Sequence, residues 1–161
     1  GTNALAPGSQ AATEHTLTTM LAVNAGADIV NGFGLIDAST VLSFEQLLLD
    51  YDLVTELLYV YKGIDVNEET VAKDLIKEVG IGGTFLAKRH TLAHLRDAWS
   101  PVVFEYGTYE DWVKRGSVDP VKRANMKAKE LLSQAKSIPP EAKVAKELDS
   151  ILRKGEKELK E

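Results

Sequence analysis

The sequence contains no cysteine among its 161 residues. This absence excludes a disulfide framework, thiol catalysis and zinc sites built on cysteine, and it fits a reducing compartment. No apolar run approaches the roughly 20 residues that a membrane-spanning helix needs, and no segment resembles a signal peptide. We therefore expect a cytoplasmic protein that does not associate with a membrane.

Basic residues are missing from the first 61 positions, and the first of the chain's 19 is Lys62. The net charge is −5, so nucleic acid is not an expected partner. With 44% hydrophobic and 27% charged residues the chain is typical of a globular protein. A surface needs charged residues to stay solvated. The charge-poor segment is therefore predicted to be packed against other residues on most sides. A lone chain of this length has too little interior for such packing, so we expect the chain to be a part of a larger protein.

Helical periodicity predicts a helix-rich chain with two short strands. Ser43, Asn67 and Thr108 are predicted N-terminal caps, and Gln46 completes a capping box with Ser43. Strands are predicted over 27–32 and 81–86, and helices over 10–24, 43–61, 68–78, 91–99, 108–116, 119–137 and 140–158. Alternating helices and strands favour an α/β fold with a parallel sheet. Two parallel strands cannot bury both faces, so further strands must come from elsewhere.

Candidate site residues follow the two predicted strands. Asn31, Phe33 and Gly34 lie in the stretch NGFGL, where glycines allow close approach of a ligand and Phe33 lines a pocket or packs in the core. Gly82, Gly83 and Thr84 follow the second strand, but no Gly-Lys-Ser/Thr sequence comes after them. A tight turn beside a large ligand is favoured there over a phosphate loop.

His90 and His94 share one helix face in the stretch HTLAH. The glutamate of a zinc-binding HExxH motif is absent, and His15 is the remaining histidine, so no metal site is predicted. His90 either caps its helix or faces the site, and His94 packs against neighbours or lies at the solvent edge.

Asp50 stands apart from the other acids of its predicted helix. Glu45, Asp52 and Glu56 share a narrow polar face, whereas Asp50 falls in an apolar arc. A buried carboxylate needs a partner. We expect either a salt bridge, a cap for a neighbouring loop, or an acid that supports a functional group.

Aromatic residues gather around Glu105. Trp99, Trp112 and the nearby tyrosines are predicted to seal a loop; the alternative is a cage for a quaternary ammonium ion. The Lys/Glu-rich tail has apolar positions at helical spacing, which suggests docking on a body or a partner.

The chain resembles the carboxy-terminal region of the trimethylamine methyltransferase family. The block GIGGTFLAKRHTLAHLRDAWSP followed by EDW carries the most specific part of the resemblance, which extends to about residue 138. The resemblance implies that residues 1–118 are the last βα units of a TIM barrel and that 119–161 form a C-terminal helical extension. It also implies methyl transfer from trimethylamine to the Co(I) corrinoid of a separate corrinoid protein, as in methanogenesis, and a homo-oligomeric enzyme.

Family members specific for trimethylamine use pyrrolysine, which would precede Gly1, so the catalytic residue is not among these residues and the chain alone is expected to be inactive. Asn31, Phe33, Gly34, Gly82, Gly83, Thr84 and His90 are then expected to face the substrate or the corrin, with no metal bound directly. The alternatives are a glycine betaine-type methyltransferase without pyrrolysine, a non-enzymatic helical interaction module, and a barrel enzyme acting on phosphorylated substrates.

Overall fold

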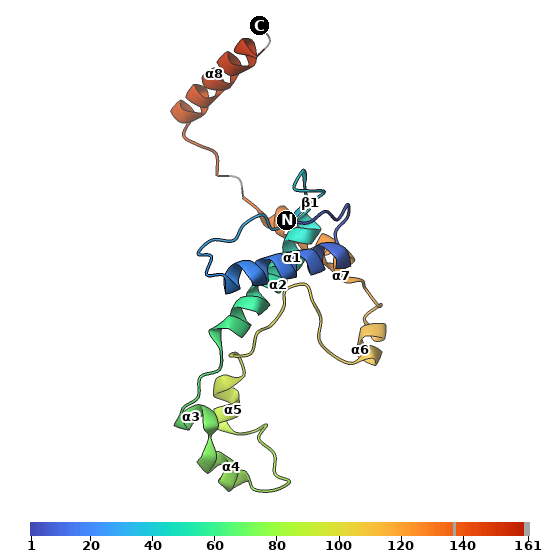
Figure 1. Ribbon diagram of the computed structural model, residues 1–161, viewed down its shortest axis with the longest axis vertical. Coiled ribbons are helices and arrows are strands. Elements are labelled where there is room, and N and C mark those ends of the chain that lie inside the picture. Colours follow the sequence, from blue (N-terminus) through green and yellow to red (C-terminus); the bar gives the residue numbers. More distant parts are fainter. Residues whose placement is uncertain (137, 160–161) are drawn as a thin grey trace. The chain divides into compact units, whose positions relative to one another are not determined.

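The computed structural model describes residues 1–136 and 138–159. It divides into two compact units, Gly1–Lys129 and Glu130–Glu161. The first contains α1 (Ser9–Asn24), β1 (Leu35–Ile36), β2 (Val41–Leu42), α2 (Phe44–Lys62), α3 (Glu68–Val71), α4 (Lys73–Val79), α5 (Arg89–His94), α6 (Tyr109–Lys114) and most of α7 (Pro120–Gln134) (Figure 1). The second contains the end of α7 and α8 (Ala142–Glu158). Within the described ranges, no helix is long and apolar enough to cross a membrane.

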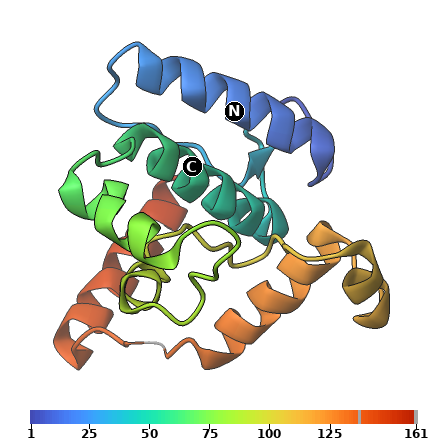
Figure 2. The same cartoon turned by 90° about the horizontal axis from the view of Figure 1, so that it is seen from below.

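The packing of α1 against α2 organises the first unit. Ala11, His15 and Thr19 are the buried residues of α1, and their spacing of four places them on one stripe. Figures 1 and 2 show this helix lying across α2, with the β1–β2 hairpin near one end of the pair. Ala4 and Ile36 join Ala11 in a small apolar cluster. The helices α1 and α2 and the hairpin therefore form one packed body.

The predicted helix caps are confirmed. The Ser43 side chain accepts the Gln46 N–H at 3.2 Å, the Asn67 side chain accepts from two backbone N–H groups, and Thr108 caps α6. The capping box at Ser43 is only half formed, because the Gln46 side chain bonds elsewhere. The predicted helix over 68–78 breaks into α3 and α4 at Ala72, whose φ of 50° is left-handed.

Both predicted strands are wrong in this structure, and the parallel sheet, which also needs strands from outside this chain, stays a prediction. Residues 27–32 and 81–86 have no strand pairing. Among the described residues the only sheet is the antiparallel pair β1–β2, with Leu35 opposite Leu42 and Ile36 opposite Val41. A strand needs a neighbour to receive its backbone hydrogen bonds, and these residues offer the two segments none. The structure is mixed and mostly helical, which is compatible with a piece of a larger α/β domain.

A second core joins α2, the loop before α6, and α7. Leu49, Val103 and Ala124 form its buried cluster. Asp52 is fully buried there, and its carboxylate accepts the backbone N–H groups of residues 102–104 at 2.6–2.7 Å. Asp52, which was predicted on the narrow polar face of this helix, can be buried because these three donors replace the water that the carboxylate gives up.

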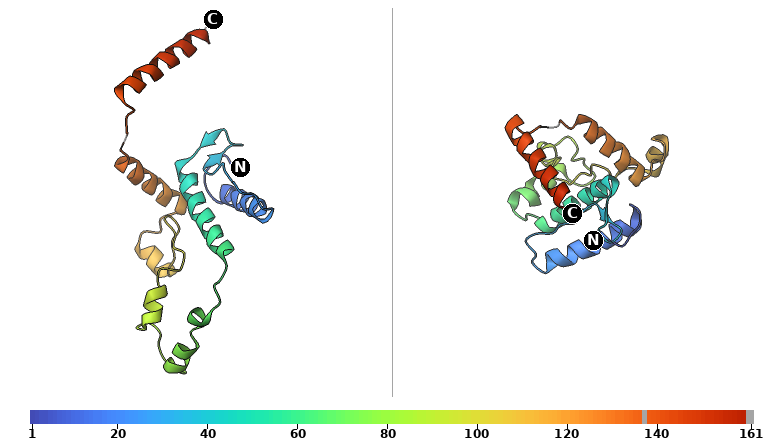
Figure 3. Two further views of the ribbon diagram at one scale, coloured as in Figure 1. Left: turned by 90° about the vertical axis from the view of Figure 1, so that its left-hand side faces the viewer. Right: turned by 90° about the horizontal axis from the view of Figure 1, so that it is seen from above.

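The segment from α3 to α5 lies beyond the C-terminal end of α2 (Figures 1 and 3). Its three short helices contain no buried residue. α5 ends at His94 and not at Trp99 as predicted, because the chain turns where the Asp97 N–H bonds to the His94 carbonyl.

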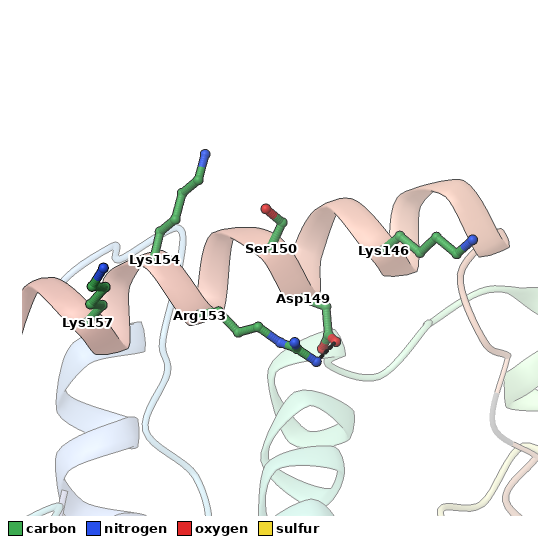
Figure 4. A pocket seen from close by; sticks show the side chains of 6 residues that line it. All are labelled: Lys146, Asp149, Ser150, Arg153, Lys154 and Lys157. Carbon is green, nitrogen blue, oxygen red and sulfur yellow. Dashed lines mark hydrogen bonds and ion pairs between the residues drawn. The ribbon is translucent and has the colours of Figure 1, made fainter.

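The second unit presents α8 as an amphipathic helix without a buried residue. Lys146, Ser150, Arg153 and Lys157 follow one face of it, and Arg153 pairs with Asp149 at 3.2 Å (Figure 4). A hollow of about 530 Å³ runs along this face, but all of its lining side chains belong to this one helix. We interpret it as a solvated charged face.

Candidate functional site

A small cavity lies between α1 and the segment that the sequence marked as a strand end. Its volume is about 90 Å³, and it is lined by Gly1, by His15, Thr18 and Thr19 of α1, and by residues 30–33. By liquid volume it has room for roughly three water molecules. We call it the His15 cavity.

His15 is the buried titratable group of this cavity. The residue is 2% exposed, and its Nδ1 atom lies 2.8 Å from Asp50 Oδ2, although not in the alignment of a linear N–H hydrogen bond. Within the described part of the chain, Nε2 is buried and has no hydrogen-bond partner. One ring nitrogen therefore faces a carboxylate, and the other is buried without a partner among these residues.

Asp50 connects α1, α2 and the glycine-rich loop through its two carboxylate oxygens. Oδ2 accepts the Gly34 N–H at 2.7 Å, and Oδ1 accepts from Gln46 Nε2 at 2.7 Å. Gln46 Oε1 in turn accepts the Gly8 N–H at 3.1 Å. Asp50 is completely buried. The expected loop cap is therefore present at Gly34, and Gln46 fixes the carboxylate from a further side. The contact with His15 is a salt bridge only when the imidazole is protonated.

Glu14 holds the amino-terminal residues beside the cavity. Its carboxylate accepts the Thr2 hydroxyl at 2.5 Å and the Asn3 N–H at 2.8 Å, and Gln10 donates to its other oxygen. The hydrogen bonds from Thr2, then Gln10 and Asn3, lower the pKa of Glu14 from its usual value. The segment that carries Gly1 to the cavity is thus tied to α1 itself.

The geometry supports binding of a small cation. A carboxylate on Nδ1 favours the imidazole tautomer whose proton is on that nitrogen, which leaves Nε2 as an acceptor. All lining residues belong to the first 61 positions, where lysine and arginine do not occur. In this part of the site, Asp50 is held nearby and no lysine or arginine side chain repels a cation.

The predicted site residues divide into two groups. Asn31 and Phe33 line the His15 cavity, and Gly34 lies behind it with its N–H bound to Asp50. Gly82, Gly83 and Thr84 are exposed between α4 and α5 and do not line the cavity. A Cβ on Gly83 would lie 2.3 Å from the Val79 carbonyl oxygen, so this glycine is required for a close turn of the backbone. A role for these three residues beside a ligand stays a prediction.

His90 is also separate from the cavity. It lines a polar hollow with Glu68, Glu69 and residues 72–75, and its Nε2 lies 2.8 Å from the Glu69 carbonyl oxygen. His94 stacks near it, with ring centroids 4.4 Å apart, and contacts Asp97 at 2.5 Å. The hydrogen bond to Asp97 is the main reason that the pKa of His94 is raised. Across the described residues, no group of three or more His, Cys, Asp or Glu side chains could hold a metal ion.

The aromatic residues around Glu105 form two separate pairs. Trp99 packs edge-on against Tyr106 and donates to the Thr55 hydroxyl at 3.0 Å, whereas Tyr109 packs on Trp112. Pairing and hydrogen bonding of this kind favour the predicted seal of the loop over a cage.

An apolar hollow adjoins the cavity at Phe33. It has a volume of about 410 Å³ and is lined by Leu47, Tyr51, Val54 and their neighbours on α2. Phe33 lines both spaces.

The sequence analysis missed His15 as a site residue. Two signals could have identified it. The residue lies four positions from Ala11 and from Thr19 in a helix almost free of charge, and Asp50 required a buried partner. The two positions are 35 residues apart in the sequence, and no periodicity within one helix links them.

Comparison with known proteins identifies the relatives of the chain. Residues 1–160 match the family model described as trimethylamine methyltransferase. The chain is 33% identical over 155 residues to a trimethylamine methyltransferase of Methanosarcina mazei, covering 96% of this chain and 31% of that protein. It is likewise 33% identical over 152 residues to a trimethylamine methyltransferase of Desulfitobacterium hafniense, covering 94% and 31%.

A relative named for a different substrate also matches. It is a glycine betaine methyltransferase of Desulfitobacterium hafniense, 30% identical over 134 residues, or 82% of this chain and 27% of that protein. The chain spans less than a third of the length of these relatives.

Proposed function

Because the chain belongs to the trimethylamine methyltransferase family, we propose that it forms the carboxy-terminal part of an enzyme that removes a methyl group from trimethylamine. The methyl acceptor in this proposal is the reduced corrinoid of a separate protein, which acts as a second substrate. The observation that carries the proposal is the His15 cavity, a small space with one buried acid nearby and no lysine or arginine in its lining.

The charge of the cavity favours trimethylamine as the donor. An aliphatic amine resembles a lysine side chain, whose reference pKa is about 10.4, so trimethylamine is mainly a cation at neutral pH. Asp50 lies behind the His15 ring and attracts a cation placed at Nε2. The chain's contribution to such a site is to bind and orient the amine, which is catalysis by positioning.

Glycine betaine is the second candidate substrate, since a glycine betaine methyltransferase is among the relatives. Betaine carries a carboxylate, and its recognition calls for a cationic or strongly donating group. This part of the site offers Asn31 and the two threonines as neutral donors but no lysine or arginine. The proposal therefore places trimethylamine first.

The apolar hollow beside Phe33 is the surface that we assign to the acceptor side of the site. Its lining is mainly apolar, although Asp50 and Thr55 belong to it, whereas the cavity that shares Phe33 with it contains the imidazole. A methyl group directed past Phe33 would leave the His15 cavity and reach an acceptor that is bound on the mainly apolar hollow. In the proposed enzyme, the upstream pyrrolysine would supply the remaining contact with the amine.

The test uses the full polypeptide that contains this chain, expressed with the translation system for pyrrolysine. It is incubated under reducing conditions with a corrinoid protein and either trimethylamine or glycine betaine, and the demethylated amine is quantified by proton NMR. We expect dimethylamine from the first substrate and at most a trace of dimethylglycine from the second. Betaine-dependent turnover alone would reverse the assignment, and turnover of neither substrate would reject the proposal.

A further inference from the structure

The starting observation is a polar atom that is buried without a partner. His15 Nε2 has no hydrogen bond within the described residues, although the residue is 98% buried. Leaving such an atom unpaired is costly, and native structures satisfy almost all of them with protein groups, water or a ligand. His15 lines the cavity, so a molecule bound in the cavity would lie beside the imidazole ring.

The surroundings of the ring fix what kind of group Nε2 can meet. Asp50 Oδ2 lies 2.8 Å from Nδ1 and calls for a proton there. Asp50 cannot turn away without losing its bonds from Gly34 and Gln46. With the proton on Nδ1, Nε2 has a free lone pair and can accept a hydrogen bond from a donor.

We propose that His15 Nε2 accepts a hydrogen bond from the N–H of a protonated tertiary amine, and that this contact selects such amines over quaternary ammonium ions. The inference rests on the proposed function and specifies which class of amine the site prefers. A protonated tertiary amine has one N–H donor and a positive charge. A quaternary ion of similar size has the charge but no N–H donor, so Nε2 would stay without a hydrogen bond in its complex. An unpaired buried group of this kind discriminates strongly between two ligands.

The contact is compatible with the chemistry of methyl transfer. When a methyl group passes from the tertiary ammonium ion to a two-electron nucleophile, the C–N bonding pair stays on nitrogen. The product is a neutral secondary amine that keeps the proton which His15 had contacted. His15 thus orients the amine without gaining or losing a proton and is a positioning residue.

The test measures binding of two cations to the full polypeptide by isothermal titration calorimetry. Trimethylammonium carries the N–H donor, and tetramethylammonium is its quaternary counterpart. For His15→Ala we expect trimethylammonium affinity to fall about 10- to 100-fold, the range of a hydrogen bond to a charged group. Tetramethylammonium affinity should change less than about 2-fold because no hydrogen bond is lost. The matched control is Thr13→Ala on the exposed side of α1, which should leave both affinities unchanged.

His15→Gln provides a second variant because its side-chain oxygen can also accept a hydrogen bond. It should recover part of the preference for trimethylammonium, which a purely structural role of His15 would not predict. Equal losses for both cations in His15→Ala, or no loss for either, would overturn the inference while leaving the proposed function in place. Failure of the unsubstituted protein to bind trimethylammonium would overturn both.

A measurement on the unsubstituted protein covers the case in which both variants fail to fold. With ¹⁵N-labelled histidine, trimethylammonium should shift the Nε2 resonance of His15, because the lone pair becomes a hydrogen-bond acceptor. Tetramethylammonium should leave that resonance nearly unchanged. The same shift with both ions would show that the N–H is not recognised.

Discussion

Replacing Asp50 by asparagine tests how the candidate site is held together. The two carboxylate oxygens serve three groups at once: the Gly34 N–H, Gln46 Nε2 and His15 Nδ1. Asparagine has one oxygen and one NH₂ group at the same positions. If its oxygen faces Gly34, its NH₂ group points at the NH₂ group of Gln46, and two donors meet. If Gln46 rotates to accept, the Gly8 N–H loses its own acceptor.

Every arrangement of Asp50→Asn therefore loses one buried hydrogen bond and the charge that strengthened the others. We expect a loss of about 2–3 kcal/mol in the free energy of unfolding, the range of one hydrogen bond to a charged group. Asp50→Ala leaves all three donors unpaired and should cost about 3–6 kcal/mol. The exposed Asp28→Asn removes the same charge without a buried partner and serves as the control, with a change within about 0.5 kcal/mol.

The assay is chemical denaturation of the full polypeptide combined with amide hydrogen exchange. Exchange should accelerate at the Gly8 and Gly34 amides, which report the two ends of the network. If Asp50→Asn and Asp28→Asn had equal stability, and if the Gly34 amide kept its protection, the carboxylate would not be the link between loop and helices.

Three further predictions concern the glycine turns, the second core and pH. Gly34 and Gly82 both have φ of +77°, but a Cβ at Gly34 would lie 2.8 Å from α2, whereas a Cβ at Gly82 would meet open space. Gly82→Ala should therefore lower the free energy of unfolding by about 1–2 kcal/mol. Gly34→Ala should lower it by about 1–3 kcal/mol more because of overpacking, and denaturation midpoints of the two variants measure the difference. Asp52→Ala should cost about 3–6 kcal/mol, since it leaves three backbone N–H groups without an acceptor, and amide exchange in that loop should rise. The hydrogen bond to Asp97 raises the pKa of His94. The stabilisation of α5 by this hydrogen bond is therefore complete below the pKa of an unfolded imidazole, roughly 6.5, and is lost as the pH rises through the higher pKa of the folded state. Amide exchange in α5 should accelerate over that pH range, and it should accelerate much less in Asp97→Asn.

Helices could be predicted from the sequence because their signals are local. Ser43 and Asn67 cap the helices that the sequence assigned to them, since capping depends on atoms within one turn. The two predicted strands were wrong for the opposite reason, because a strand depends on hydrogen bonds with a neighbour that the local sequence does not specify. Asp52 shows the same limit, since the backbone donors that bury it lie about 50 residues away.

The candidate site was predictable only in part. The glycine-rich segment around Asn31 and Phe33 lines a cavity, where the backbone approaches other groups closely. Its contact with a substrate or a corrin stays a prediction. The partner of Asp50 could be anticipated as a necessity but not named. Identifying His15 required knowing that α1 crosses α2 at that point, and this crossing is a property of the packed body.

The roles of Asp50 and His15 differ in a way that separates fold from function. Asp50 supports the loop, the helix pair and the imidazole together, so a change at this position should reduce both stability and amine selectivity. The hydrogen bonds of the loop and of Gln46 do not involve His15, whose ring only receives the orientation that Asp50 imposes. A substitution at His15 that preserves its volume should therefore reduce selectivity with a smaller effect on stability. If both positions lowered stability and selectivity in the same proportion, the imidazole would belong to the scaffold and not to the ligand site.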